Sequence, residues 1–82
     1  MRATVLVRPK GGILDPQGEA VERSLRQLGF EVGEARVGRV IDLEVDASSA
    51  DEARSQLERM CEDLLANPLI ESYEIELEEH SA

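Results

Sequence analysis

The sequence predicts an α+β protein in which a four-stranded antiparallel sheet carries two helices on one face. Three observations predict it. Apolar and polar residues alternate in four short segments, apolar residues recur at helical spacing in two longer ones, and these segments follow one another in the order β-α-β-β-α-β. The length of 82 residues suits a single domain, 1–82, with an ordered core at about 2–79.

The first half predicts a strand and then a helix. From Arg2 to Arg8, apolar residues occupy alternate positions, as in a half-buried strand. Asp15 and Pro16 are typical of a helix start, because an aspartate accepts hydrogen bonds from free N–H groups and a proline is tolerated in the first turn. Gly29 follows the apolar pattern and provides a left-handed end for the helix.

The middle of the chain predicts two strands that form a hairpin. Residues 31–37 are the first of them, and their alternation slips by one position at Gly33, which predicts a β-bulge there. Residues 40–45 alternate strictly and form the other strand. Gly38 and Arg39 make the tight connection between the two.

The last part predicts a second helix and a final strand. Ser49 and Glu52 have the spacing of a capping box, and apolar residues then recur on one helical face. Pro68 disfavours helical geometry in the residue before it, so the helix is expected to end near residue 66. Residues 72–78 alternate as a strand, and residues 80–82 are expected to fray.

The complete order is that of the ferredoxin-like fold, in which both helices cover the same face of the sheet. The second face is therefore expected to be bare and mostly charged. Its expected side chains are Leu6, Arg8, Glu34, Arg36, Asp42, Glu44, Glu74 and Glu76. Arg8, on a central strand, is expected to pair with the acidic strands beside it.

The composition and length of the chain limit the kinds of partner that it can have. The formal net charge of −9 repels phosphate backbones, so no nucleic-acid partner is expected. The sequence has neither an apolar run of about 20 residues nor a recognisable leader, which predicts a cytoplasmic protein with no membrane association. A chain this short buries little of its own surface, which favours association with other chains.

No combination of side chains suggests catalysis. The single His, His80, lies in the expected tail, and the single Cys, Cys61, lies on the apolar face of the second helix, where an inert core thiol is the simpler interpretation. The ligand spacings of zinc and calcium sites are missing, and Glu74, Glu76 and Glu78 are better explained as a solvated or arginine-paired face. The sequence therefore predicts no catalytic, cofactor-binding or metal-binding residue.

Gly18 lies inside the first predicted helix, where glycine costs about 1 kcal/mol relative to alanine. Two explanations stay open. Another backbone, such as that of a partner, approaches this position closely, or the helix simply tolerates the glycine.

Three segments carry a resemblance to the PurS family, and the resemblance covers essentially the whole chain up to Glu79. They are Ile13–Val21, which contains LDPQG, Val37–Leu43, and Met60–Glu71, which reads MCEDLLANPLIE. Their order and spacing are difficult to obtain by chance in a generic small domain.

The resemblance implies a non-catalytic small subunit of phosphoribosylformylglycinamidine (FGAM) synthase, in de novo purine biosynthesis. In this family, a glutaminase subunit (PurQ) releases ammonia and a large synthetase subunit (PurL) uses ATP and Mg²⁺ to convert formylglycinamide ribonucleotide (FGAR) to FGAM. PurS bridges the two and assists ammonia transfer. The resemblance further implies a homodimer or homotetramer that binds no cofactor of its own.

Partner contacts are expected in the loops that join charges to unusual backbone positions, namely residues 10–18 and the predicted hairpin tip. The expected contact residues are Lys10, Asp15, Gln17, Gly18, Arg39 and Asn67. Simpler roles stay open for Asp15 as a helix cap and for Asn67 as a helix-ending residue.

One alternative from another class stays open, an ACT-like regulatory module that binds small molecules, which shares the topology alone. An RNA-recognition module fits less well, because Phe30 and Tyr73 are the only aromatic residues. A free-standing enzyme fits least, because its general base would be a carboxylate on an open sheet face.

Overall fold

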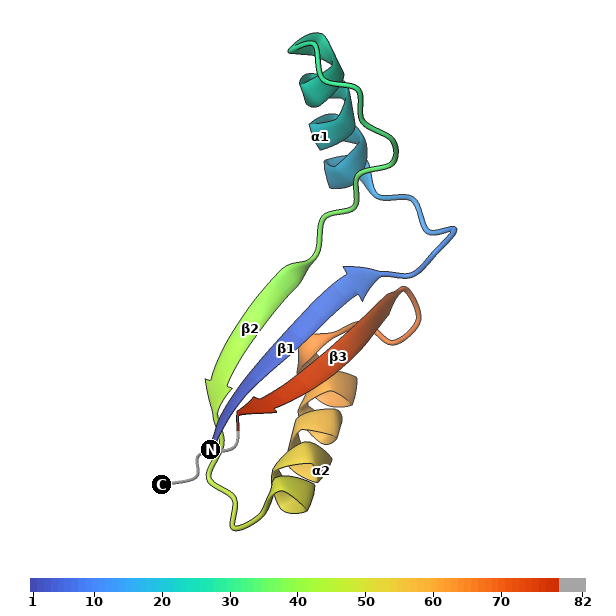
Figure 1. Cartoon of the computed structure of the whole chain (residues 1–82). Coiled ribbons are helices and arrows are strands. Elements are labelled where there is room, and N and C mark those ends of the chain that lie inside the picture. The colour runs from blue at the N-terminus through green and yellow to red at the C-terminus, as the bar shows by residue number, and fades with distance from the viewer. Residues whose placement is uncertain (79–82) are drawn as a thin grey trace.

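The computed structural model describes residues 1–78 and has the element order β-α-β-α-β. The elements are β1 (Arg2–Pro9), α1 (Pro16–Gln27), β2 (Arg39–Glu44), α2 (Ala50–Met60), a π-helical turn (Cys61–Leu65) that continues α2, and β3 (Glu71–Glu78). The molecule is elongated, with extents of 50 × 30 × 14 Å, and α1 projects beyond one end of the sheet (Figure 1). The frayed tail expected at residues 80–82 lies outside the described residues.

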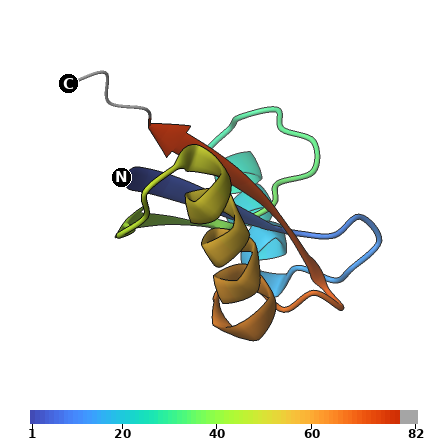
Figure 2. The same ribbon diagram turned by 90° about the horizontal axis from the view of Figure 1, so that it is seen from below.

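The sheet is antiparallel with the order β2-β1-β3, so the N-terminal strand is central. Val5 lies opposite Ile41 of β2 and Ile75 of β3, which places apolar side chains of all three strands on one face. α2 runs across that face (Figure 2). The periodicity of the sequence therefore predicted the three strands and the covering helix correctly.

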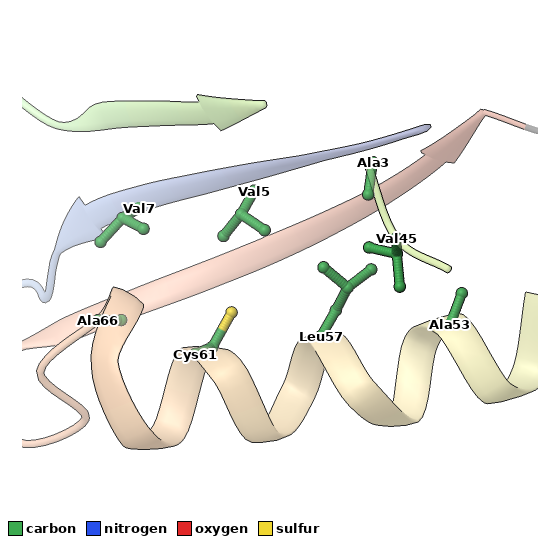
Figure 3. Close-up of a cluster of buried hydrophobic side chains, with 8 residues drawn as sticks. All are labelled: Ala3, Val5, Val7, Val45, Ala53, Leu57, Cys61 and Ala66. Atoms are coloured by element: carbon green, nitrogen blue, oxygen red, sulfur yellow. The ribbon is translucent and has the colours of Figure 1, made fainter. Parts of the chain in front are cut away.

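The core lies between β1 and α2 (Figure 3). β1 contributes side chains from alternate positions, and α2 with its π-helical turn contributes one side chain per turn. The buried residues are Ala3, Val5, Val7, Val45, Ala53, Leu57, Cys61 and Ala66. These side chains are aliphatic apart from one thiol, as expected from a composition that is poor in aromatic residues.

α2 begins at the predicted cap. The Ser49 hydroxyl accepts a hydrogen bond from the backbone N–H of Glu52 at 3.1 Å. The Glu52 carboxylate accepts hydrogen bonds from the backbone N–H and hydroxyl of Ser48, so the return bond of the capping box is made one residue before the cap. Within residues 1–78, no helix is both long and apolar enough to cross a membrane.

The predicted strand at 31–37 is wrong, and with it the four-stranded sheet, the bulge at Gly33 and the hairpin through Gly38 and Arg39. This segment has no regular secondary structure and runs back along α1. Its backbone N–H groups bond to side chains of the helix region instead of a neighbouring strand: Val37 donates to Asp15 at 2.8 Å and Ala35 donates to Glu22 at 3.4 Å. These contacts satisfy the donors that a ladder would otherwise need.

The predicted position of the first helix is also wrong. α1 does not lie beside α2 on the sheet, and α2 is the helix that covers it. α1 and the segment that returns along it form a projecting arm (residues 14–37). Apolar side chains of this arm are exposed, namely Leu14, Val21, Leu28 and Phe30.

The uncovered sheet face is charged, as predicted. Arg8 pairs with Glu74 at 3.2 Å, and the Thr4 hydroxyl donates to Asp42 at 2.9 Å, both across neighbouring strands. Glu34 and Arg36 are not on this face, because both belong to the arm.

Candidate partner interface

The residues predicted from sequence to contact partners fall into two groups. Lys10, Arg39 and Asn67 come together at one end of the sheet, where three loops meet. Asp15, Gln17 and Gly18 lie at the base of the arm, at the start of α1.

Arg39, the first residue of β2, is fixed against the loop that precedes β3. Its guanidinium donates to both carboxylate oxygens of Glu71, at 2.7 and 3.0 Å, and to the carbonyl oxygen of Leu65 at 2.5 Å. Such a two-point contact fixes direction as well as distance. The hydrogen bonds from Arg39, followed by one from the backbone N–H of Asn67, lower the pKa of Glu71 below its ordinary value.

Lys10 and Asn67 complete this arrangement. The Lys10 ammonium donates to the carbonyl oxygen of Pro68 at 2.6 Å, and its backbone N–H donates to Ile70 at 2.9 Å. The Asn67 side chain accepts from Leu69 N–H at 3.1 Å and so shapes the turn. Lys10, Arg39, Asn67 and Glu71 form what we call the loop clasp. It ties the ends of β1 and β2 to the loop before β3.

The arm is attached at its base through Asp15. One carboxylate oxygen accepts from Gly18 N–H at 3.1 Å, as a helix cap, and the other accepts from Val37 N–H at 2.8 Å. Arg36 lies 3.9 Å from the same carboxylate. The hydrogen bonds from Val37 and Gly18, with a smaller contribution from Arg36, lower the pKa of Asp15.

Gly18 is buried, and a close backbone approach explains it. A Cβ at this position would lie 2.1 Å from the carbonyl oxygen of Ala35. The approaching backbone belongs to the same chain, so contact with a partner is not needed to account for the glycine. Gln17 is exposed on the first turn of α1.

Basic side chains gather where the arm joins the sheet, although the chain as a whole is acidic. Arg8, Arg36 and Arg39 line a hollow of about 260 Å³ there, and the Arg36 guanidinium donates to the carbonyl oxygen of Lys10 at 2.7 Å. Each of these side chains is held by a carboxylate or a carbonyl group. The region therefore has fixed shape and charge, which suits docking to another protein surface.

Two residues that this region uses were not among the contact residues predicted from the sequence. Glu71 is the partner of Arg39 across a separation of 32 residues, and no local pattern predicts such a pair. Leu69 is 83% exposed at the tip of the loop that the clasp supports. Exposed apolar side chains on a rigid loop are typical of contact sites.

Comparison with known proteins decides the family. The profile described as PurS, phosphoribosylformylglycinamidine (FGAM) synthase, matches residues 2–79. The chain belongs to the PurS family. The PurS subunit of Methanocaldococcus jannaschii is 38% identical over 94% of both chains, and that of Bacillus subtilis is 39% identical over 95% of this chain and 93% of its own.

Solved PurS structures share the observed fold. The crystal structure of the M. jannaschii PurS subunit superposes with a TM-score of 0.84 over 96% of both chains, at 38% identity. A structure of PurLQS from Thermotoga maritima contains a chain that matches with a TM-score of 0.84, at 37% identity, over 92% of this chain and 93% of that one. The PurS family thus includes the three-stranded arrangement that replaced our four-stranded prediction.

The single cysteine of this PurS-family chain is inert in the folded state. Cys61 has none of its surface exposed, and burial, with the nearby charges of Glu62 and Glu58, raises the pKa of its thiol. A buried thiol with a raised pKa is a poor nucleophile. The interpretation of Cys61 as a core residue is therefore confirmed.

We expect the attachment of the arm to depend on pH through Asp15. Because the folded state lowers this pKa below the ordinary value of 3.8, the stabilisation is complete above that value and is lost as pH falls through the lowered one. Asp15→Asn should be less stable at pH 7 and should lose less stability on acidification. Urea unfolding at pH 7, 4 and 3 measures both slopes. Glu52 and Glu71 also have lowered pKa values, but they are present in both proteins and contribute equally to the pH dependence of each. If the free energy of unfolding falls equally with pH in both proteins, Asp15 does not have this role.

Proposed function

We propose that this protein is the non-catalytic small subunit of an FGAM synthase made of separate chains. In this proposal, a PurL subunit activates FGAR with ATP and Mg²⁺, a PurQ subunit releases ammonia from glutamine, and this chain bridges them and assists ammonia transfer. The observation that carries the proposal is the family match over residues 2–79, together with the likeness to a chain of the T. maritima PurLQS structure.

A bridging role agrees with the physical character of the chain. Ammonia that escapes to water is lost to the synthetase reaction, and a closed interface between subunits prevents that loss. Hydrogen bonds and ion pairs hold the charged side chains of the loop clasp and of the base of the arm, so these two groups can position two larger subunits. We place the ATP, the Mg²⁺ and the reacting groups on those subunits, and the whole complex in the cytoplasm.

We assign the contacts with the larger subunits to the two groups of residues described above. Lys10, Arg39 and Asn67 present the loop that carries Leu69, while Asp15 and Gly18 hold the arm and Gln17 is exposed beside them. The protein itself is a homodimer or homotetramer in this proposal. Its small core and the exposed apolar side chains of the arm favour association.

Charge reversal tests the assigned contacts. We expect Arg39→Glu to prevent formation of the three-chain complex on a sizing column, because it breaks the bond to Glu71 and places two carboxylates together in the loop clasp. Arg54→Glu is the control, since Arg54 is exposed on α2 outside both groups. Unchanged assembly with Arg39→Glu would remove the loop clasp from the proposed interface. Loss of assembly with both variants would point to net charge rather than to this site.

A further inference from the structure

The direction of the arm relative to the sheet is not set by packing of its helix. α1 makes no substantial contact with β1, β2, β3 or α2, and the arm projects beyond one end of the sheet (Figure 1). A helix of 12 residues is about 18 Å long, so a rotation of roughly 10° at its base moves its far end by about 3 Å. The direction of the arm is therefore decided at its base, where it joins the sheet.

The two connections at the base of the arm differ in how tightly they pack. On the return side, a Cβ added at Gly38 would lie 2.2 Å from the carbonyl oxygen of Val7, so this backbone is pressed against β1. On the outgoing side, a Cβ added at Gly11 or Gly12 would meet no atom within 4 Å. Two successive glycines in open space allow the backbone to change conformation at little cost. Packing therefore holds the return connection but not the outgoing one.

A single hydrogen bond joins the arm to the rest of the chain. The Arg36 guanidinium donates to the carbonyl oxygen of Lys10 at 2.7 Å. Within residues 1–78, no other hydrogen bond or ion pair links residues 14–37 to residues outside that range. The same carbonyl oxygen accepts the N–H of Ile13 at 3.2 Å, which closes the turn that contains the two glycines. Arg36 therefore holds the outgoing connection that packing leaves loose.

Arg36 is itself oriented by two carboxylates of the arm. Its three guanidinium nitrogen atoms face three different partners. Nε lies 3.9 Å from Asp15, Nη1 lies 3.7 Å from Glu34, and Nη2 makes the bond to Lys10. A planar guanidinium has donors in fixed directions, whereas the ammonium of a lysine is a compact point charge that does not fix direction in this way. The residue type is thus matched to a positioning role.

The residue that Arg36 holds also belongs to the loop clasp. The Lys10 backbone N–H donates to the carbonyl oxygen of Ile70 at 2.9 Å, and its ammonium donates to that of Pro68 at 2.6 Å. The carbonyl oxygen of Lys10 thus bonds to the arm, while its N–H and side chain bond to the loop before β3. This one residue connects the arm to the loop clasp.

We infer that Arg36 is a positioning residue that sets the direction of the arm relative to the sheet and, through Lys10, couples that direction to the loop clasp. Without Arg36, the arm keeps its own fold but rotates on the glycine connection. The coupling rests on the proposed function, because it needs larger subunits that dock on the loop clasp. Coupling between two sites is reciprocal, so a subunit bound at the loop clasp narrows the range of arm directions.

The distance between two spin labels in one chain measures the direction of the arm. Gln27→Cys places one label near the far end of α1, and Ser55→Cys places the other on α2, both at exposed positions. Cys61 does not react with the label, because it is fully buried. An excess of unlabelled protein ensures that only distances within one chain are recorded, whatever the oligomeric state.

We expect Arg36→Gln to widen the distance distribution by about 3 Å or more, which corresponds to a rotation of roughly 10° at the base. Arg36→Lys should widen it as well, because it keeps the charge but loses the planar group. Arg26→Gln is the matched control. Arg26 also bonds to a carboxylate and a backbone carbonyl, those of Glu22 and Val32, but both belong to the arm. The control should therefore leave the distribution unchanged.

Gly11→Ala tests the same idea by rescue. The φ angle of Gly11 is not positive and an added Cβ meets no neighbour, so alanine fits there and restricts the backbone. Combined with Arg36→Gln, it should restore at least half of the lost sharpness of the distribution. Absence of any rescue would contradict rotation on the glycine connection.

Three outcomes overturn the positioning role. The first is an unchanged distribution in Arg36→Gln, and the second is equal widening in Arg26→Gln. The third is a loss of helix content by circular dichroism in both Arg36 variants, because Arg36 would then hold the arm together rather than set its direction.

The larger subunits test the coupling separately. PurL and PurQ should narrow the distribution of the unaltered protein and not that of Arg36→Gln. Equal narrowing in both would overturn the coupling and leave the positioning role intact. If PurL and PurQ do not bind the unaltered protein, the proposed function and the coupling fail, while the measurement on the chain alone still decides the role of Arg36.

Discussion

Gly18→Ala should destabilise the protein, although the same change stabilises an ordinary exposed helix. Helix propensity alone predicts a gain of about 1 kcal/mol in the free energy of unfolding. Here the new methyl group would lie 2.1 Å from the carbonyl oxygen of Ala35 and 2.7 Å from a carboxylate oxygen of Asp15. Because the closest atom is backbone, relief requires the returning segment to move, which costs about 1–3 kcal/mol.

Urea unfolding followed by circular dichroism measures the sign of this effect. Ser24→Ala is the matched control, because Ser24 is exposed on the same helix and should show only the gain from propensity. A stabilised Gly18→Ala variant would contradict the close approach of the returning segment. Movement of that segment should also weaken the bond between Asp15 and Val37, so the variant should lose part of its pH dependence.

Leu57→Ala should cause the largest loss of stability of any single substitution considered. Leu57 is fully buried at the centre of α2 and points toward β1 (Figure 3). Its truncation leaves a cavity in the core and costs about 2–5 kcal/mol. Small domains have only about 5–15 kcal/mol in total, so the variant is expected to be partly unfolded at 37 °C.

Thermal unfolding with Leu64→Ala as control tests this assignment. Leu64 lies on the same helical segment but is exposed in the single chain, so its truncation should change the monomer by less than about 0.5 kcal/mol. A Leu57→Ala variant as stable as Leu64→Ala would show that the core is assigned incorrectly.

Local periodicity explains what could be predicted. β1, β2 and β3 alternate, α2 has an apolar face, and the caps Asp15 and Ser49 were both identified from residue type and spacing. These signals lie within a few residues of one another, so the sequence displays them directly.

The error at residues 31–37 has a cause far along the chain. Alternation there was irregular, and the segment is held by Asp15 and Glu22 of the arm rather than by a strand. Apolar residues recur at helical spacing in α1, which indicated that the helix needs a cover, but this pattern does not specify which surface provides the cover. Our prediction chose the sheet of the same chain, which was wrong.

Only part of the candidate interface was predicted, because its residues also meet through contacts between distant segments. Lys10, Arg39 and Asn67 were chosen separately, and the fold places them together at one end of the sheet. Glu71, which holds Arg39, was missed because ion pairs between distant segments leave no spacing pattern. The contacts of Lys10, Arg39 and Asn67 with the larger subunits stay a prediction.

The most direct test of the bridging role is the rate of FGAM formation by PurL and PurQ subunits with and without this chain, using either glutamine or free ammonium as the nitrogen source. We predict that the chain is required with glutamine and has little effect with ammonium, because only the first route needs ammonia to pass between subunits. Equal rates with glutamine in the absence of the chain would contradict the proposed function.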